Sequence, residues 1–436
     1  MWVLTESYGL YKLDYQTLSI INHYSFFCTL NNEYVPSKTL YVDKNGYVWV
    51  GTQRGLYIMN PETEEYSHFT NSKSDIFTLP SNSVWTIEED AQKNVWIGTY
   101  SGGLCYLNFQ ETSRFRTFSP RENGLNHKVV SGFAEDDESL WIATEGGGVN
   151  RMNKKTGEFR YYTHNPSRNS LTYDNVKSLL IDPSQNLWVA MYRGGLDCFS
   201  HKTSAFKRFN KDYRSDNGML TNDLRKIILE ADSGLWISYQ STGISFYSFA
   251  TDRFTHYMSK RDNNNSSISD LCRGKGDDLW VVNNEELYYM NVRTKEYRKI
   301  APDSTYSLRA QALCLDETGN VWIGTVGSGL VRYDVKNNRF YSVNDILRYE
   351  VSTIYSLCTD DDNDLWMGTD NGLFKYNIEK NTFFRFDKKD GIQGIVFYPK
   401  ACMKGKNGEL YFGGTNGFTI INPKEVLLSE FKPTHL

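Results

Sequence analysis

The stretch Val95-Trp96-Ile97-Gly98-Thr99, followed by a polar turn and Gly103-Leu104, decides the fold. Its β-branched and aromatic residues, bounded by glycine, are typical of a short strand that enters a tight turn. The same pattern recurs along the chain with tryptophan or, in the last copy, tyrosine at the anchor position. The ten anchors are Trp2, Trp49, Trp96, Trp141, Trp188, Trp236, Trp280, Trp322, Trp366 and Tyr411.

The anchors are regularly spaced, with intervals of 47, 47, 45, 47, 48, 44, 42, 44 and 45 residues. One copy contains four strand-like segments, called A to D in chain order, at residues 84–88, 95–99, 104–108 and 115–118. Four short antiparallel strands in about 45 residues match one blade of a β-propeller. A helical solenoid has a similar period, but these segments are too short, too aromatic and too often interrupted by glycine.

The two ends of the chain predict how the blades close. The chain opens with B, C and D segments and ends with A, B and C segments, so strands from both ends could complete one blade. Counting seven anchors back from Tyr411 reaches Trp141, and residues 115–118 could then supply the missing outer strand. We therefore expect an all-β fold with a partial propeller of three blade-like repeats at 1–112, a seven-bladed propeller at 113–424 and a tail at 425–436. The alternative is a single, unusually large ring of all ten repeats.

Composition excludes several classes of function. The 48 basic and 52 acidic residues leave a net charge of −4, and no polybasic run is present, which argues against a nucleic-acid or anionic membrane surface. No stretch is apolar over the roughly 18 residues that a membrane-spanning helix needs. The first residues also lack the features of a secretory signal. Tyr, Phe and Trp contribute 30, 24 and 10 residues, which favours strands over helices.

The repeat reads Asp-x-x-Gly-Asn-(Leu/Val)-Trp-Ile-Gly-Thr-x-x-Gly-Leu, and a Ser-Leu-x-x-Asn-x-Val type of segment follows the outer strand, as at residues 79–84 and 170–176. It resembles the two-component regulator propeller repeat in the sensor regions of hybrid two-component systems, known mainly from gut Bacteroidetes. In that family, two seven-bladed propellers precede an immunoglobulin-like domain, a membrane helix and a histidine kinase. The resemblance implies a periplasmic location and, as partners, an upstream propeller and downstream signalling domains. It also implies that this chain senses a ligand but carries no kinase module, and is not itself an enzyme.

Most repeated residues are expected to be structural. The anchor ring should fill the wedge between blades, the following Gly should permit the turn into strand C, and the Thr hydroxyl should satisfy local backbone groups. Cys272, Cys314 and Cys358 lie eight residues before their anchors and Cys402 nine before Tyr411, so we expect equivalent, buried thiols too far apart for disulfides.

No metal or cofactor is expected. The chain has no histidine pair at ligand spacing, no Cys-x-x-Cys and no phosphate-binding loop. The acidic run at residues 360–364 offers oxygen ligands for Ca²⁺, but it occupies the turn between strands A and B, so a solvated turn is the preferred interpretation.

Ligand binding is expected where the blades differ, in the B-to-C turns and D-to-A loops that emerge on one face. Tyrosine beside Arg, Gln, Asn or Asp suits a carbohydrate, because rings stack on sugar faces while charges and amides bind hydroxyl or acidic groups. The leading candidates are the adjacent pairs Tyr192-Arg193 and Tyr239-Gln240. The other candidates are Glu145, Asn283, Asp370, Asn371, Arg168 and Arg214.

The sequence thus favours a ligand-sensing propeller that recognises an oligosaccharide outside the inner membrane, and it is compatible with a homodimer. A protein-interaction scaffold is one alternative, and a broad exposed apolar patch would favour it. A propeller lyase or glycoside hydrolase is another, which would need two inward carboxylates or a Tyr/His pair.

Overall fold

The protein is described by a computed structural model that covers residues 1–30, 33–71, 78–91, 94–107, 115–211, 218–259, 267–283, 285–301, 308–343 and 351–426. Its contacts divide the chain into Met1–Thr112, called unit 1, and Ser113–Leu436, called unit 2. The described fold is built from β-strands, together with one short 3-10 helix, η2 (Lys388–Asp390). Among the described residues, no helix is long and apolar enough to cross a lipid bilayer.

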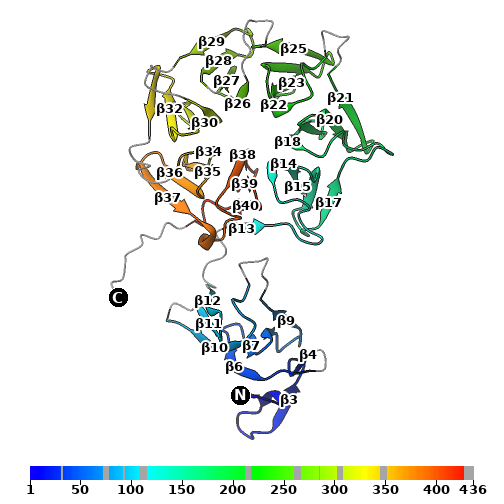
Figure 1. The fold of residues 1–436 in the computed structure, drawn as a ribbon, viewed down its shortest axis with the longest axis vertical. Helices are drawn as coiled ribbons and strands as arrows, with labels where there is room; N and C mark the ends of the chain where they lie inside the picture. Colours follow the sequence, from blue (N-terminus) through cyan, green and yellow to red (C-terminus); the bar gives the residue numbers. More distant parts are fainter. Residues whose placement is uncertain are drawn as a thin grey trace. The chain divides into compact units, whose positions relative to one another are not determined.

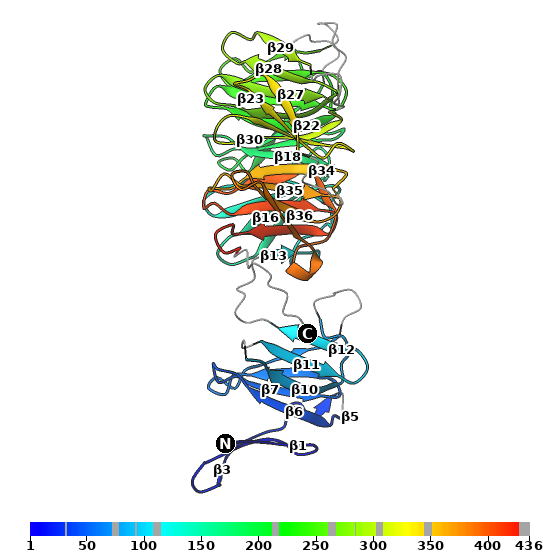
Figure 2. The same cartoon turned by 90° about the vertical axis from the view of Figure 1, so that its left-hand side faces the viewer.

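Unit 2 contains seven four-stranded antiparallel sheets arranged as a ring (Figure 1), which Figure 2 shows edge-on. Six sheets are formed by consecutive strands. They comprise β14 (Val130–Glu135), β15 (Ser139–Thr144), β16 (Val149–Asn153) and β17 (Phe159–Tyr162); β18 (Val176–Ile181), β19 (Leu187–Met191), β20 (Gly195–Ser200) and β21 (Ala205–Phe209); β22 (Leu224–Glu230), β23 (Gly234–Tyr239), β24 (Ile244–Ser248) and β25 (Arg253–Tyr257); β26 (Ile268–Arg273), β27 (Asp278–Asn283), β28 (Leu287–Asn291) and β29 (Tyr297–Ile300); β30 (Ala310–Leu315), β31 (Val321–Thr325), β32 (Leu330–Asp334) and β33 (Arg339–Ser342); and β34 (Ile354–Thr359), β35 (Leu365–Thr369), β36 (Leu373–Asn377) and β37 (Thr382–Phe386).

The seventh sheet joins distant parts of the chain. It contains β38 (Phe397–Lys404), β39 (Leu410–Gly414), β40 (Gly417–Ile421) and, at its outer edge, β13 (Phe115–Phe118). Phe115 pairs with Ile421 and Phe118 with Phe418 in antiparallel register. Residues 115–118 therefore complete this sheet and are not the fourth strand of the copy that begins at residue 84, because pairing at the last sheet removes an open edge from the ring.

Unit 1 contains the first three anchors in a shorter series of sheets. The first sheet has three strands, β1 (Trp2–Thr5), β2 (Gly9–Leu13) and β3 (Ile20–Tyr24), and a small hairpin of β4 (Thr29–Leu30) and β5 (Glu33–Tyr34) follows it. A four-stranded sheet comes next, with β6 (Ser37–Val42), β7 (Val48–Thr52), β8 (Gly55–Met59) and β9 (Tyr66–Phe69). The last sheet has three described strands, β10 (Val84–Glu89), β11 (Val95–Thr99) and β12 (Gly103–Leu107).

The anchor ring packs against the sheet that follows it, which confirms the expected wedge-filling role for most copies. Trp280 of β27, for example, lies in one buried cluster with Leu313 and Ile323 of the next sheet. The last anchor of unit 2, Tyr411, packs with Val130 and Phe133 of the first sheet, so the series of contacts closes on itself. Burying such large apolar rings between every pair of sheets supplies the main favourable free energy of the ring.

A carboxylate in the turn between strands A and B holds the anchor indole in most copies. This acid accepts the indole N–H and usually backbone N–H groups of its own turn as well, so it fixes the turn and the ring together. The pairs are Asp43–Trp49 at 3.1 Å, Asp90–Trp96 at 2.9 Å, Asp136–Trp141 at 2.8 Å, Asp182–Trp188 at 2.9 Å, Glu230–Trp236 at 2.7 Å, Asp316–Trp322 at 2.9 Å and Asp360–Trp366 at 2.8 Å.

The acidic run at 360–364 is only partly the solvated turn that the sequence predicts. Asp361 and Asp362 are exposed, but Asp360 and Asp364 are buried. The Lys375 ammonium lies 2.9 Å from Asp364 and 3.6 Å from Asp360, so a cation from the protein itself occupies the interior of this turn. No group of three or more His, Cys, Asp or Glu side chains placed to hold a metal occurs in the described part of the chain.

The Gly-Thr pair after the anchor has two separate roles. The Thr hydroxyl donates to the carbonyl of the first residues of strand C, as in Thr325 to Gly329 at 2.7 Å, which confirms its expected role. The Gly has a different role from the one predicted. A Cβ on Gly324 would lie 2.7 Å from the Ile354 side chain and 3.0 Å from its carbonyl oxygen, so glycine permits close approach of the next sheet.

Cys402 is not equivalent to the other strand A cysteines. Cys358 pairs with the anchor Trp366, whereas Cys402 pairs with Phe412, one residue beyond the anchor Tyr411. The prediction of equivalence is wrong because Met403, not Cys402, pairs with the anchor Tyr411, and strand alternation places the side chain one residue earlier on the other sheet face. All seven cysteines are free thiols.

Candidate functional site

The inner strands of unit 2 carry the polar residues that distinguish one blade from another. Strands β14, β18, β22, β26, β30, β34 and β38 lie innermost in the ring (Figure 1). The first residue of each strand is buried and apolar, and the register shifts just after it. Such a bulge re-aims the next side chain. In β18 this next residue is Lys177, and in β22 it is Arg225.

Lys177 connects two blades that are far apart in the sequence. Its ammonium contacts the Glu145 carboxylate and donates to the Tyr398 hydroxyl at 3.2 Å. Tyr398 in turn donates to Glu145 at 2.7 Å. Burial, and then the Glu145 charge, raise the pKa of the Tyr398 phenol well above its ordinary range, so it remains a hydrogen-bond donor at neutral pH. The three groups form a closed polar network between β38, β18 and the turn after β15.

The predicted pair Tyr192-Arg193 lies beside this network. The Lys177 ammonium is 5.6 Å from the centre of the Tyr192 ring, and the Arg193 guanidinium is 5.2 Å from it. Arg193 is exposed, with a φ of 65°, and its backbone N–H donates to Asp223 at 3.0 Å. The half-buried Tyr192 ring therefore has two cations close to it.

Gln240 contacts Arg225, which occupies in β22 the position that Lys177 occupies in β18. Its side-chain oxygen accepts the Arg225 Nε–H at 2.5 Å. Next to Arg225, the Lys226 ammonium contacts the buried Asp270 carboxylate at 2.7 Å, and Asp270 also accepts the Leu313 backbone N–H at 2.9 Å. Asp270 is thus tied to the backbone of the following blade.

Lys400 of β38 lies within electrostatic reach of these groups. Burial, reinforced by the positive charges of Arg225, Lys226 and Lys177, lowers the pKa of Lys400 to about 8, while Asp270 opposes this shift. Within the described residues, the Lys400 ammonium makes no hydrogen bond and no ion pair. We call the following set the inner-strand cluster: Glu145, Lys177, Tyr192, Arg225, Lys226, Gln240, Asp270, Tyr398 and Lys400.

Several predicted site residues lie elsewhere. Tyr239 is completely buried in a core cluster with Trp188 and Leu224, so the proposal that its ring stacks on a ligand at the surface is wrong. Strand alternation places it inside, because it is the last residue of β23 and faces the core. Gln240, one residue later, is exposed.

Three other predicted residues make hydrogen bonds within or next to their own loops. Asn283 accepts the backbone N–H groups of Glu285 and Glu286 at 2.8 and 2.6 Å. Asp370 accepts from the Ser352 hydroxyl at 2.7 Å, and Asn371 accepts from Arg385 at 2.7 Å. No hydrogen bond or ion pair among the described residues joins these side chains, or the exposed Arg168, to the inner-strand cluster. Arg214 lies outside the described residues.

Sequence reasoning missed Lys177, Arg225, Tyr398 and Lys400. The sequence contained part of the information needed to find Lys177 and Arg225. Other blades carry Ser131, Ser269 or Gln311 at this position, so the repeat itself does not require a basic residue there. Lys400 had no such signal, because two additional residues shift the register of β38. Inner strands from distant parts of the chain meet around one axis only because the ring is closed.

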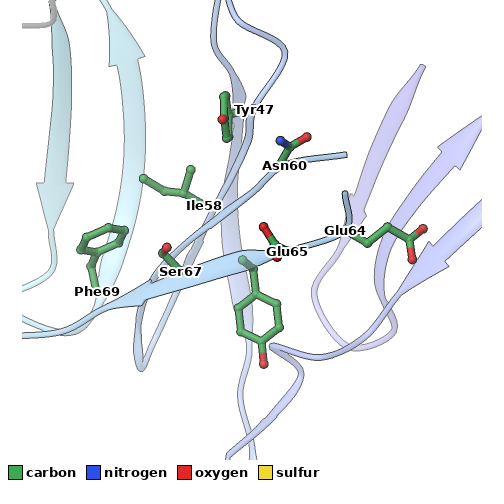
Figure 3. A pocket seen from close by; sticks show the side chains of 8 residues that line it. Tyr47, Ile58, Asn60, Glu64, Glu65, Ser67 and Phe69 are labelled. Atoms are coloured by element: carbon green, nitrogen blue, oxygen red, sulfur yellow. The ribbon is translucent and has the colours of Figure 1, made fainter. Parts of the chain in front are cut away.

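A separate hollow of about 580 Å³ lies in unit 1 (Figure 3). Its lining comes from the A-to-B turn, β8 and the segment around β9, and contains exposed aromatic rings and two carboxylates but no basic side chain. Its walls come from a single sheet and the turns between its strands, whereas the inner-strand cluster joins several blades. We therefore take the inner-strand cluster as the candidate site. The hollow is lined by Tyr47, Ile58, Asn60, Glu64, Glu65, Tyr66, Ser67 and Phe69.

Comparison with known proteins agrees with this architecture. Residues 29–54, 78–101 and 349–371 match the family described as two component regulator propeller. Histidine kinase P4 of Formosa agariphila is 26% identical over 491 aligned residues, which cover 99% of this chain and 32% of that protein. The chain thus spans about a third of the length of this curated relative.

Solved structures share the fold. The extracellular domain of BT3049 from B. thetaiotaomicron, assigned to a hybrid two component system, has a TM-score of 0.67 and 21% identity, covering 97% of this chain and 60% of that chain. A streptogramin B lyase has a TM-score of 0.54 and 13% identity over 71% of this chain and 97% of its own. At these identities the likeness concerns the fold. The repeats and the closed ring identify a β-propeller, and three segments of the chain match the two component regulator propeller family.

Proposed function

We propose that this chain is the ligand-sensing propeller region of an extracytoplasmic two-component signalling protein, and that its ligand is an oligosaccharide. The matched repeats, the histidine kinase relative and the fold shared with extracellular domains support the signalling role. Upstream propeller blades and downstream signalling domains would be supplied by the rest of such a protein. Ligand binding would then shift the population between packing states of these parts, because only differential affinity can move such an equilibrium.

The observation that carries the ligand proposal is the setting of Tyr192. A half-buried ring close to two cations, the Glu145 carboxylate and the Tyr398 hydroxyl brings an aromatic side chain and polar groups together in one region. Sugars present the same combination of apolar C–H faces and hydroxyl groups. The network is anchored on inner strands of a closed ring, which is a rigid support for a binding site.

Binding without chemistry is the expected activity. Both carboxylates of the inner-strand cluster are engaged by ammonium groups, Glu145 by Lys177 and Asp270 by Lys226. A general acid or base must be free to exchange a proton with the substrate, whereas these two carboxylates already bind ammonium groups of the protein. The arrangement therefore suits recognition better than glycoside hydrolysis.

A thermal-shift screen of the full chain against neutral and acidic oligosaccharides tests the proposal, because a ligand bound only by the native state raises the Tm. A selective, saturable rise that disappears in Tyr192→Ala is expected. Tyr100→Ala is the matched control, since Tyr100 is an exposed residue of the corresponding turn in unit 1. A rise that persists in Tyr192→Ala would contradict the site, and no rise with any glycan would favour a protein-interaction scaffold. A new reaction product would favour the lyase or hydrolase alternative.

A further inference from the structure

The inner-strand cluster contains more positive than negative charge. Its basic groups are Lys177, Arg225, Lys226 and Lys400, and its acidic groups are Glu145 and Asp270. Lys177 is paired with Glu145, and Lys226 with Asp270. Two cations, Arg225 and Lys400, are therefore left without a carboxylate partner among the described residues.

The Arg225 guanidinium is oriented by one hydrogen bond, and its other N–H groups remain able to bind a ligand. Its Nε–H donates to the Gln240 side-chain oxygen at 2.5 Å, and no other hydrogen bond of the guanidinium is found in the described residues. The side chain is partly buried. The two terminal nitrogens of a guanidinium match the two oxygens of a carboxylate or an oxyanion, and an oriented fork loses little further entropy when it binds.

Lys400 is held among other cations by an unusual stretch of backbone. It lies at the register shift in β38 and has a φ of 62°, a conformation that costs free energy for a residue with a Cβ. Burial and the surrounding cations lower its pKa to about 8, so at neutral pH most of it still carries an unpaired charge. An incoming anion would offset the repulsion that Arg225, Lys226 and Lys177 exert on this ammonium.

We propose that Lys400 and Arg225 bind an anionic group, a carboxylate or a sulfate, at the inner strands of unit 2. The inference rests on the proposed function in one respect, because it assigns the charge class of the ligand that Tyr192 stacks on. The shared chemistry is a compact oxyanion, which either an acidic sugar or a free inorganic anion supplies. Glu145 and Asp270 remain bound to their lysines and so do not compete for the site.

The test uses the full chain at pH 7 and constant ionic strength, with the Tm measured in sodium sulfate, sodium D-glucuronate, D-glucose and a sodium chloride reference. We expect sulfate and glucuronate to give saturable rises that glucose and chloride do not. Lys400→Met and Arg225→Met should each weaken the anion effect about tenfold or more, as expected for loss of a charge-assisted contact. A stronger effect of glucuronate than of sulfate would identify the acidic sugar as the source, and the reverse would identify the free anion.

Lys38→Met is the matched control. Lys38 occupies in β6 the place that Lys177 occupies in β18, and it pairs with Glu6 in unit 1. This variant should leave the anion response unchanged. The response of the parent should also weaken as the pH rises from 7 to 9, because Lys400, with a pKa of about 8 among Lys177, Arg225, Lys226 and Asp270, loses its charge over this range. The Lys400→Met variant should lack this pH dependence.

Three outcomes would overturn the inference. Rises equal to those in chloride, an undiminished rise in both Lys400→Met and Arg225→Met, or an equal loss in Lys38→Met would each do so. If Lys400→Met fails to fold, Arg225→Met and the pH dependence of the parent decide the matter. A neutral oligosaccharide that binds through Tyr192 with no preference for acidic sugars would contradict the anion site but leave the proposed function intact.

Discussion

Unit 1 and unit 2 are built from one repeat but differ in how their series of sheets ends. In unit 2 every anchor ring has a following sheet, and the last anchor, Tyr411, packs on the first sheet. In unit 1, Trp49 packs on the sheet that contains Val84 and Ile97, but no further sheet of unit 1 follows β10–β12 in the described residues. Trp96 is consequently 39% exposed, whereas Trp322 is 1% exposed. The same side chain is a core residue or a surface residue depending on whether the ring closes.

The polar network shows the same contrast. Glu6 and Lys38 of unit 1 form an ion pair at 2.6 Å, at the repeat positions that Glu145 and Lys177 occupy in unit 2. The Glu6 side chain is 63% exposed, against 13% for Glu145. The next blade contributes Trp85 in unit 1, which the Lys38 ammonium faces, where unit 2 has Arg225. The ion pair at these repeat positions thus lies at the surface of one unit and in a partly buried network of the other.

The largest expected effect comes from removing an anchor ring from each unit. Trp322→Ala should lower the free energy of unfolding of unit 2 by about 3–5 kcal/mol, because a fully buried ring is lost and a cavity remains. Trp96→Ala should lower that of unit 1 by less, since Trp96 is already 39% exposed and less apolar area is lost from the core. Urea denaturation followed by hydrogen exchange of peptides from each unit measures both. Equal losses would mean that another surface covers Trp96 in solution.

The ion pairs should show a smaller difference of the same kind. Glu145→Gln should destabilise unit 2 by about 1–3 kcal/mol, because Lys177 loses a partly buried charge partner. The corresponding Glu6→Gln change should fall within about 0.5 kcal/mol, as is usual for an exposed pair. The same denaturation experiment applies, with Glu138→Gln as a control on an exposed acid of unit 2. A cost for Glu6→Gln as large as that for Glu145→Gln would remove the distinction between the two networks.

The smallest effect concerns acid stability. Asp197 of β20 is buried, and burial raises its pKa from 3.8 to about 6 despite two hydrogen bonds from Thr172. The folded state therefore keeps a proton that the unfolded state has released. The stabilisation from this group is present below pH 3.8 and is lost as the pH rises through about 6.

In the parent, this group should make the free energy of unfolding of unit 2 decrease as the pH rises from 4 to 6. Asp197→Asn should abolish that decrease. Urea titrations at several pH values measure the difference between variant and parent, which cancels the contributions of other groups. The transition of unit 1 serves as the internal reference and should be the same in both proteins. An identical pH dependence in parent and variant would show that Asp197 is ionised in the fold throughout.

Much of the architecture could be predicted because it depends on local pattern. The anchor spacing identified every sheet except the β4–β5 hairpin, and counting anchors assigned residues 115–118 to the outer edge of the last one, where β13 pairs with β40. Errors arose where one residue of register matters. Tyr239 faces the core and Cys402 the opposite sheet face because strand faces alternate with every residue.

The candidate site was predictable only in its outer part. Tyr192, Arg193, Glu145 and Gln240 were found because turns that vary on a uniform scaffold are visible in the sequence. Their partners were not found, since Lys177 and Tyr398 are 221 residues apart and meet only in the ring.

The sequence by itself determined the repeat, the strand pattern and, in most copies, the carboxylate that holds the anchor indole, since these depend on residues within a few positions of one another. Tertiary structure alone decided which anchors are buried and which cations lack a partner. Both depend on closure, because a ring brings the first and last sheets together and places inner strands from distant repeats around one axis. Lys400 and Arg225 lie in different blades, and only the closed ring brings their unpaired charges into the same cluster.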